Sequence, residues 1–176
     1  MHTVWVRLNA VVFFGLTVLL GLSCLAAFSK IGHSYIHQPI INTLELNTLR
    51  SLKSHGGVDR ALLSFNIDAD MNPAFHWNVK QLFVYVVASY ETSSKEINDV
   101  VIWDKIIENI DSVEDKHIKQ ENVFVKYALV DQGNELRGKD VSLRLMWDHM
   151  PITGFVYMDS QAKDTTTSFS LPLEYK

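Results

Sequence analysis

The chain has 176 residues, of which 47% are hydrophobic, and its 16 basic and 20 acidic side chains give a net charge of −4. A chain of this length fits one domain with a short appendage. Only Arg7 and Lys30 are charged within the first 30 residues, so the remainder is more acidic than the whole. An acidic domain without a stripe of Lys and Arg excludes nucleic acid as the expected partner, because nucleic-acid binding needs clustered cations.

The single cysteine, Cys24, lies inside an apolar N-terminal segment. One cysteine permits neither a disulfide within the chain nor a cysteine-based metal site. His33 and His37 are spaced as two residues on one helix face, but no third ligand accompanies them and Pro39 opposes a continuing helix. We therefore expect no bound metal and no cofactor.

Residues 10–28 contain no charged side chain and consist mostly of Val, Leu, Phe and Ala. A helix of this length spans about 28 Å, close to the hydrocarbon thickness of a bilayer. We therefore predict a transmembrane helix over residues 10–28, surrounded by lipid, between a short cytosolic tail at 1–9 and a linker at 29–39. Arg7 favours a cytosolic N-terminus, which would place residues 40–176 in the lumen. The alternative is a signal peptide cleaved near the small residues 23–27, although its apolar region would normally be only about 7–15 residues long.

The pattern after the linker has a period of two, which is typical of strands. A first strand is expected over residues 40–49. Residues 61–69 alternate between apolar and mostly polar side chains, with Ala61, Leu63, Phe65, Ile67 and Ala69 on one face. Asn72 and Pro73 then predict a turn.

The most apolar strand is expected over residues 82–88. Successive side chains of a strand point to opposite sides, so one face would hold Phe83, Tyr85 and Val87 and the other Leu82, Val84, Val86 and Ala88. A strand of an antiparallel sandwich normally turns one face to water. We therefore predict either a central strand covered by loops or a strand whose outer face is covered by another chain.

Two segments downstream are less regular. Residues 100–107 are expected to form a strand with Trp103 on one face and Ile102 on the other. Residues 108–120 are charged and predict turns, with room for a short helix. Residues 122–130 then predict a strand with one face made of Val123, Val125, Tyr127 and Leu129, followed by a loop at 131–134.

The last clear strand is expected over residues 141–147, where Val141, Leu143, Leu145 and Trp147 alternate with Ser142, Arg144, Met146 and Asp148. Pro151 ends it, and weaker strands follow near 155–158 and 166–171. Seven or eight strands without helical periods between them predict a mainly β fold. We expect an antiparallel β-sandwich over residues 40–176, preceded by one transmembrane helix.

No catalytic motif stands out. The Gly-x-Ser-x-Gly turn of serine hydrolases is absent. Ser160 and Lys163 match Ser-x-x-Lys only within a polar tail, and His76 is expected to be a packed or capping histidine. The acidic pair Asp68 and Asp70 is expected on a solvated face, while Asp104 and Lys105 are expected to pair across strands or to face a partner. The large aromatic side chains are the candidate anchors of the core or of a partner surface: Trp77, Phe83, Tyr85, Trp103 and Trp147.

Five sequence blocks resemble, in order and spacing, subunit 3 of the signal peptidase complex. They are FNIDAD (65–70), WNVKQLF (77–83), VVIWDKII (100–107), DQGNELRG (131–138) and VSLRLMW (141–147). The resemblance extends from the apolar N-terminal segment to about Met158. It implies a single-span subunit of the endoplasmic reticulum membrane, with a cytosolic N-terminus and a luminal β-sandwich. The catalytic serine would belong to another subunit, so no catalytic position is carried over to this chain.

One feature departs from that family. A glycosylation sequon often precedes the strand that begins here at Val141, whereas this chain has Asp140-Val141-Ser142 and contains no Asn-x-Ser/Thr at all. We therefore expect no N-glycosylation.

The resemblance implies a non-catalytic subunit that supports the catalytic subunit, together with the other subunits of the complex, in removing signal peptides from nascent secretory and membrane proteins. One alternative is an independent luminal binding module with a membrane anchor or a cleaved signal peptide. Another is a membrane-anchored luminal hydrolase that uses Ser160 or a histidine. The missing nucleophile motif disfavours that hydrolase.

Overall fold

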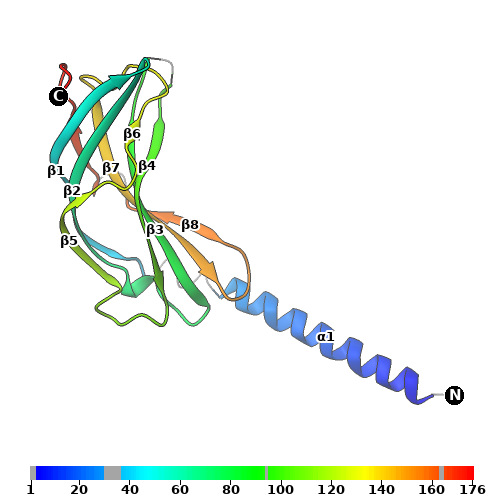
Figure 1. Cartoon of the computed structure of the whole chain (residues 1–176). Coiled ribbons are helices and arrows are strands. Elements are labelled where there is room, and N and C mark those ends of the chain that lie inside the picture. The colour runs from blue at the N-terminus through cyan, green and yellow to red at the C-terminus, as the bar shows by residue number, and fades with distance from the viewer. Residues whose placement is uncertain (1–2, 30–36, 94, 163–164) are drawn as a thin grey trace.

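The structure, a computed structural model, describes residues 3–29, 37–93, 95–162 and 165–176. One helix precedes a domain of strands (Figure 1). In chain order the elements are α1 (Val4–Phe28), β1 (Ile40–His55), β2 (Val58–Asp70), the 3₁₀ turn η1 (Asn72–Ala74), β3 (Val79–Tyr90), β4 (Asn98–Glu108), β5 (His117–Phe124), β6 (Leu129–Val130), β7 (Asp140–Pro151), β8 (Tyr157–Ser160) and β9 (Thr167–Ser170).

The N-terminal helix projects away from the strands, as Figure 1 shows. α1 has 25 residues, none of them buried, and within the described residues it is the one helix long and apolar enough to cross a membrane. The helix begins at Val4, before the predicted membrane span, and ends at Phe28, where that span was predicted to end. A helix that is apolar on all sides needs an apolar environment around it.

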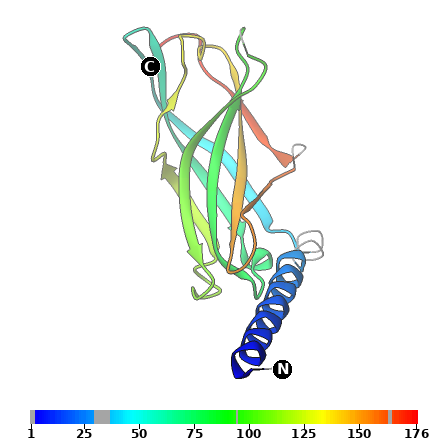
Figure 2. The ribbon, with the colours of Figure 1, turned by 90° about the vertical axis from the view of Figure 1, so that its right-hand side faces the viewer.

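The strands form two antiparallel sheets that face each other (Figure 2). In the described part of the chain, one sheet has four strands in the order β1-β2-β5, with β6 also paired to β2. The other has five strands in the order β4-β3-β7-β8, with β9 also paired to β7. This arrangement confirms the predicted mainly β fold with one N-terminal helix.

The core lies between the two sheets. The predicted inward faces of β2 and β7 are confirmed, because Ala61, Leu63, Phe65, Ile67 and Ala69 and also Val141, Leu143, Leu145 and Trp147 are all buried. The rings of Phe65 and Trp103 meet edge to face across this core, with centroids 6.1 Å apart. The apolar side chains of both sheets thus supply the burial that holds the domain together.

The prediction that Ile102 and Trp103 point to opposite faces of β4 is wrong. Val86 pairs with Trp103 and the next residue, Val87, pairs with Val101, so Ile102 is an extra residue in β4. Such a β-bulge lets two consecutive side chains point to the same side. Ile102 and Trp103 are accordingly both buried, at 0% and 5% exposure.

The predicted strand over residues 122–130 is also wrong. β5 begins at His117, inside the expected charged connection, and the described residues before it form turns rather than a helix. Asn122 has a positive φ of 53°, and β6 begins only at Leu129. Val125 and Leu129 are buried but Tyr127 is half exposed, so the expected common face does not form. The polar residues of β5 fit an edge strand that meets solvent.

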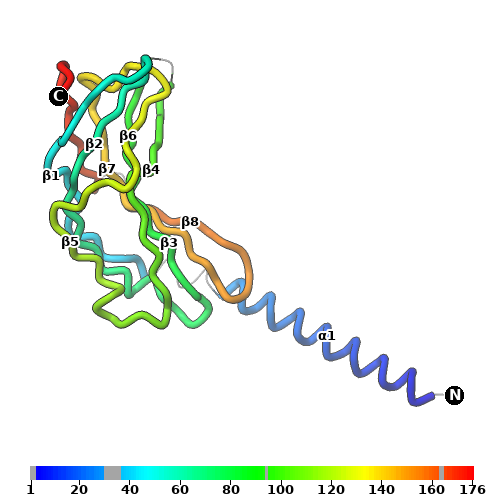
Figure 3. The backbone as a smooth tube through the Cα atoms, in the orientation of Figure 1, coloured from blue at the N-terminus to red at the C-terminus, as the bar shows by residue number. Residues whose placement is uncertain are grey.

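The C-terminal residues lie at the end of the domain far from α1, as the tube in Figure 3 shows. Lys176 pairs with Leu52 of β1 through two backbone hydrogen bonds of 2.8 and 2.9 Å. This contact satisfies backbone groups on β1, which is an edge strand of its sheet.

Candidate partner-binding face

The outward surfaces of the two sheets differ in polarity. The four-stranded sheet presents polar groups that bind one another: Asp68 accepts hydrogen bonds from Asn42 and contacts His117, whose ring nitrogen lies 2.8 Å away. The hydroxyl groups of Thr48 and Ser64 also meet on this side, 2.8 Å apart. The hydrogen bond with His117 lowers the pKa of Asp68 most, and the bond from Asn42 lowers it further. The exposed apolar side chains of Ile40 and Phe124 lie on the same side, so this outer surface is mixed, with its polar groups bonded to one another.

The five-stranded sheet turns a cluster of apolar side chains outward, with Asp104 and Asp148 among them. Phe83 lies opposite Ile106, Tyr85 lies opposite Met146, and Met158 lies opposite Asp148, so all share the outer side. Ile106 is 53% exposed and Met158 is 60% exposed, while Phe83, Tyr85 and Met146 are half-buried. We call these five residues the outer apolar face: Phe83, Tyr85, Ile106, Met146 and Met158.

Hydrogen bonds hold the centre of this face in place. The hydroxyl group of Tyr85 lies 3.4 Å from Oδ1 of Asp148 and 3.2 Å from the sulfur of Met158, and either atom can accept its single hydrogen. Burial raises the pKa of Tyr85, and the nearby negative charge of Asp148 raises it further, so the hydroxyl group stays neutral. The rings of Phe83 and Tyr85 are 5.3 Å apart. Rigid aromatic rings flanked by methionines, which adapt their shape, are suited to contact with another protein.

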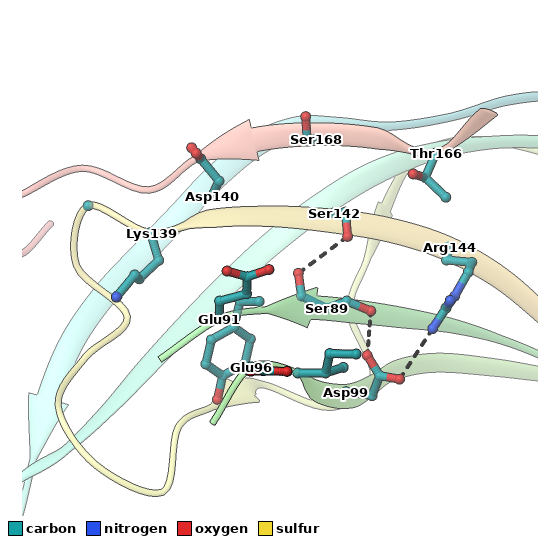
Figure 4. A pocket seen from close by; sticks show the side chains of 13 residues that line it. Ser89, Glu91, Glu96, Asp99, Lys139, Asp140, Ser142, Arg144, Thr166 and Ser168 are labelled. Atoms are coloured by element: carbon teal, nitrogen blue, oxygen red, sulfur yellow. Dashed lines mark hydrogen bonds and ion pairs between the residues drawn. The ribbon is translucent and has the colours of Figure 1, made fainter. Parts of the chain in front are cut away.

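Toward the end of the sheet that lies far from α1, the same outer side becomes polar and forms a groove of about 700 Å³ (Figure 4). Arg144 of β7 pairs with Asp99 of β4 at 3.2 Å, and Asp99 also accepts a hydrogen bond from the hydroxyl group of Ser89. The hydroxyl group of Ser142 donates to the backbone carbonyl of Ser89 at 3.4 Å. Further lining residues include Glu91, Glu96, Lys139 and Asp140.

Among the described residues, the groove does not contain the arrangement that activates a serine nucleophile. Such a nucleophile needs a neighbouring base that can take its proton. Here Ser89 donates to a carboxylate that already pairs with Arg144, and Ser142 donates to a backbone carbonyl. No histidine is among the residues that line the groove in the described chain. These contacts are structural hydrogen bonds between neighbouring strands.

The five predicted aromatic anchors fall into three places. Trp103 and Trp147 are core residues, with exposures of 5% and 3%. Phe83 and Tyr85 lie on the outer apolar face. Trp77 lies just before β3 and is 65% exposed, so it is not a core anchor. The structure thus separates residues that the sequence could only group together.

The polar candidates take part in local structure. The Nδ1 atom of His76 accepts from the backbone N–H of Asn78 at 3.3 Å, as expected of a capping histidine. Asp70 accepts from the backbone and the side chain of Asn72. Asp104 pairs with Lys126 at 3.4 Å. Lys163 and His33 lie outside the described residues, so neither the Ser160–Lys163 pair nor the His33–His37 pair is described.

Sequence reasoning placed Met146 opposite the buried side chains of its strand, but it did not identify Met146 or Met158 as part of an apolar surface. Met146 alternates with the buried side chains of β7, a position that would be polar on an ordinary solvated face. The signal that could have indicated an apolar outer side is the combination of Met146 with the two apolar faces of residues 82–88.

Comparison with known proteins gives a consistent result. A family model described as signal peptidase subunit matches residues 1–174. A protein named signal peptidase complex subunit 3 in Drosophila melanogaster is 34% identical over 161 residues, which are 89% of this chain and 88% of that protein. Proteins of the same name are 28% identical in Dictyostelium discoideum, over 99% of this chain and 97% of the relative, and 32% identical in Caenorhabditis elegans, over 96% and 94%. These matches confirm the resemblance of the five sequence blocks, and the chain belongs to the signal peptidase subunit family.

Proposed function

We propose that this chain is a non-catalytic subunit of the endoplasmic reticulum signal peptidase and supports the catalytic subunit in removing signal peptides. The name shared by the relatives, signal peptidase complex subunit 3, supports assembly with the other subunits of that complex. The apolar span at 10–28 anchors the chain in the membrane, with residues 1–9 in the cytosol. The linker at 29–39 leads to the sandwich, residues 40–176, in the lumen. Arg7 supports this orientation because basic residues favour the cytosolic side.

The outer apolar face is the observation on which the proposed mode of action depends. Apolar side chains contiguous on one side of a sheet mark an interaction surface when they are not covered within the chain. Ile106 and Met158 are more than half exposed on this side, whereas the other sheet turns hydrogen-bonded polar groups outward. We assign the outer apolar face to contact with the catalytic subunit.

The catalytic serine belongs, in this proposal, to the catalytic subunit. Ser89 and Ser142, which line the groove of the five-stranded sheet, are engaged in structural hydrogen bonds. Ser160 is exposed on the short strand β8. This chain would then act through binding alone, and cleavage of signal peptides would depend on it although none of its side chains takes part in the chemical step.

The proposal is tested by placing charges on the outer apolar face. Ile106→Asp combined with Met158→Asp should prevent recovery of the catalytic subunit with this chain from detergent extracts, because carboxylates would be buried against apolar groups. Uncleaved secretory precursors should accumulate in cells that depend on the variant. Phe124→Asp is the matched control, since Phe124 is also 53% exposed but lies on β5 in the other sheet.

The control variant should keep the complex intact and process precursors normally. Thermal unfolding of both variants in detergent should show that the domain remains folded, as expected for substitutions at exposed positions. Full recovery of the complex with the double variant would contradict the proposed contact. Equal loss with Phe124→Asp would show that the effect is not specific to the outer apolar face.

A further inference from the structure

The end of α1 contacts two loops of the sandwich directly. The side-chain amide nitrogen of Asn78 donates to the carbonyl of Ala26 at 3.3 Å. Gly154, in the turn between β7 and β8, lies so close to α1 that a Cβ atom added to it would be 3.3 Å from Cβ of Ala27. In Figures 1 and 3 this turn lies beside the C-terminal end of the helix.

Asn78 also ties the two loops to each other. Its side chain donates to the carbonyl of Thr153 at 2.8 Å and accepts from the N–H of Thr153 at 3.0 Å. The backbone carbonyl of Asn78 accepts a hydrogen bond from the backbone N–H of Ile152 at 2.8 Å. Asn78 itself is only 2% exposed. The β7–β8 turn, the residues before β3 and the end of α1 therefore form one connected unit.

The contacts place this unit at a defined depth if α1 crosses a bilayer. The hydrocarbon layer is about 30 Å thick, which a straight helix spans in about 20 residues. The charged and polar residues Arg7 and Asn9 precede the uncharged span, so that span would end near Phe28. Ala26 and Ala27 lie about 3 Å or less along the helix axis from that end. Loops that touch them must lie at the boundary between acyl chains and headgroups.

The side chains of these loops match such a boundary. Four apolar residues around Asn78 are mostly exposed: Trp77 at 65%, Ile152 at 67%, Phe155 at 63% and Val156 at 58%. We call them the apolar tip. No Asp, Glu, Lys or Arg occurs in residues 71–79 or 150–158, although the domain is acidic. By contrast, the loops at the far end, at 91–97 and 131–139, contain charges of both signs.

We propose that the apolar tip is a membrane-binding site that lies in the interfacial layer of the bilayer beside α1, with lipid as its ligand. Tryptophan is favoured at this depth, and amphipathic elements commonly bury apolar side chains about 5–10 Å into it. The sheet that bears the outer apolar face would thus be held to the membrane at the helix and at the tip. This inference requires only that α1 spans the membrane and is independent of the proposed contact with the catalytic subunit.

Lipid is favoured over a protein as the occupant because of the helix contact. A surface that touches the membrane span within one turn of its end meets the bilayer without any further partner. Charged loops would be excluded from this depth by the cost of removing charges from water. In Figure 1 the charged connection between β4 and β5 lies farther from α1 than the β7–β8 turn does.

The test uses the full chain in vesicles of phosphatidylcholine with one nitroxide label at a time. Cys24 is the only cysteine and lies exposed on α1, so labelling it reports whether the helix is in the bilayer. For the other sites Cys24→Ala removes it, and Ile152→Cys or Ile97→Cys provides a label. These two isoleucines are matched, at 67% and 66% exposure, but Ile97 lies in the β3–β4 connection at the far end.

Electron paramagnetic resonance then measures how often each nitroxide label collides with lipid-soluble oxygen and with a water-soluble nickel complex. Labels at 24 and 152 should both collide severalfold less with nickel than the label at 97, and more with oxygen. A label at 152 that is as accessible to nickel as the label at 97 would overturn the proposal, if the label at 24 is protected. Aqueous exposure at 24 as well would overturn both the membrane span and the apolar tip.

A second measurement uses Trp77 and leaves the cysteine in place. Lipids with brominated acyl chains near the headgroup should quench the fluorescence of the full chain more than that of Trp77→Phe. Trp103 and Trp147 are buried in the sandwich, and Trp5 is common to both proteins, so the difference reports Trp77. Equal quenching of the two proteins would overturn the proposal. Protection of position 152 from both oxygen and nickel, found only after other subunits are added, would replace lipid with a protein occupant.

Discussion

Tyr90 and Asp131 form a buried polar contact near the end of the sandwich that lies far from α1. The hydroxyl group of Tyr90 donates to Oδ1 of Asp131 at 2.9 Å, and the backbone N–H of Glu135 donates to Oδ2 at 3.0 Å. Burial alone would raise the pKa of Asp131, but the hydrogen bonds from Glu135, Tyr90 and neighbouring N–H groups outweigh it and lower the pKa. Burial raises the pKa of Tyr90, and Asp131 raises it further.

These shifts give a pH dependence with a definite sign. Asp131 has a folded-state pKa below its unfolded value, so it stabilises the fold above the unfolded pKa and loses that contribution as pH falls through the folded pKa. We predict that Tyr90→Phe costs about 1.5–3 kcal/mol of unfolding free energy at pH 7, because a hydrogen bond to a carboxylate is lost. The difference from the unaltered chain should shrink below about pH 4.

Guanidinium unfolding of the full chain in detergent micelles, followed by tryptophan fluorescence at pH 7 and pH 3, measures this effect. Tyr127→Phe is the control. Tyr127 is 52% exposed, so removing its hydroxyl group should lower the free energy of unfolding by less than about 1 kcal/mol. A Tyr90→Phe penalty that is the same at both pH values would show that the carboxylate does not contribute as described.

At the scale of elements, the bulge in β4 decides where Trp103 lies. The extra residue Ile102 turns both side chains toward the core, where Trp103 meets Phe65. Trp103→Ala should therefore lower the free energy of unfolding by about 3–5 kcal/mol, the usual cost of removing a large buried ring. Val101→Ala, next to the bulge and on the outer side at 39% exposure, should cost much less. Equal unfolding midpoints for the two variants would contradict the core placement.

The strands that the sequence predicted well are those with one face in the core and the other face less buried. β2 and β7 alternate buried and less buried side chains, so a period of two located both strands and their inward faces. β5 was missed because residues 117–122 are exposed or polar at almost every position, and only pairing with β2 makes them a strand. The bulge in β4 was missed because it is fixed by register against β3, which a single strand does not encode.

The candidate site was predictable in part. The apolar strand at 82–88 indicated an outer side covered by something, and Phe83 and Tyr85 do lie there. Ile106, Met146 and Met158 come from three other strands, so their meeting on one face depends on the strand order β4-β3-β7-β8. Periodicity shows which side of a strand is apolar, whereas the neighbours of that strand follow only from the fold.

At the scale of the whole molecule, the position of Asp140 offers a test of orientation. Asp140 is exposed at the start of β7, at the end of the domain far from α1, and accepts a hydrogen bond from Ser170. Asp140→Asn creates the sequon Asn-Val-Ser, so a luminal domain should gain one glycan in cells. A glycosidase-sensitive shift in gel mobility measures it, with Asp140→Asn plus Ser142→Ala as the control. The unaltered chain should show no shift, and an unmodified but folded Asp140→Asn chain would contradict the luminal placement.

Gly154 has a consequence for which changes this molecule can tolerate. Its φ of +118° is strained for any residue with a side chain, and it abuts Ala27 of α1. A larger residue there would strain the β7–β8 turn and force the turn or α1 to shift slightly at this contact. Neither the sandwich core nor the helix would be destabilised by this change, which would act on the contact between them. The protein would remain folded and inserted, while the contact that orients the sandwich against α1 would be weakened.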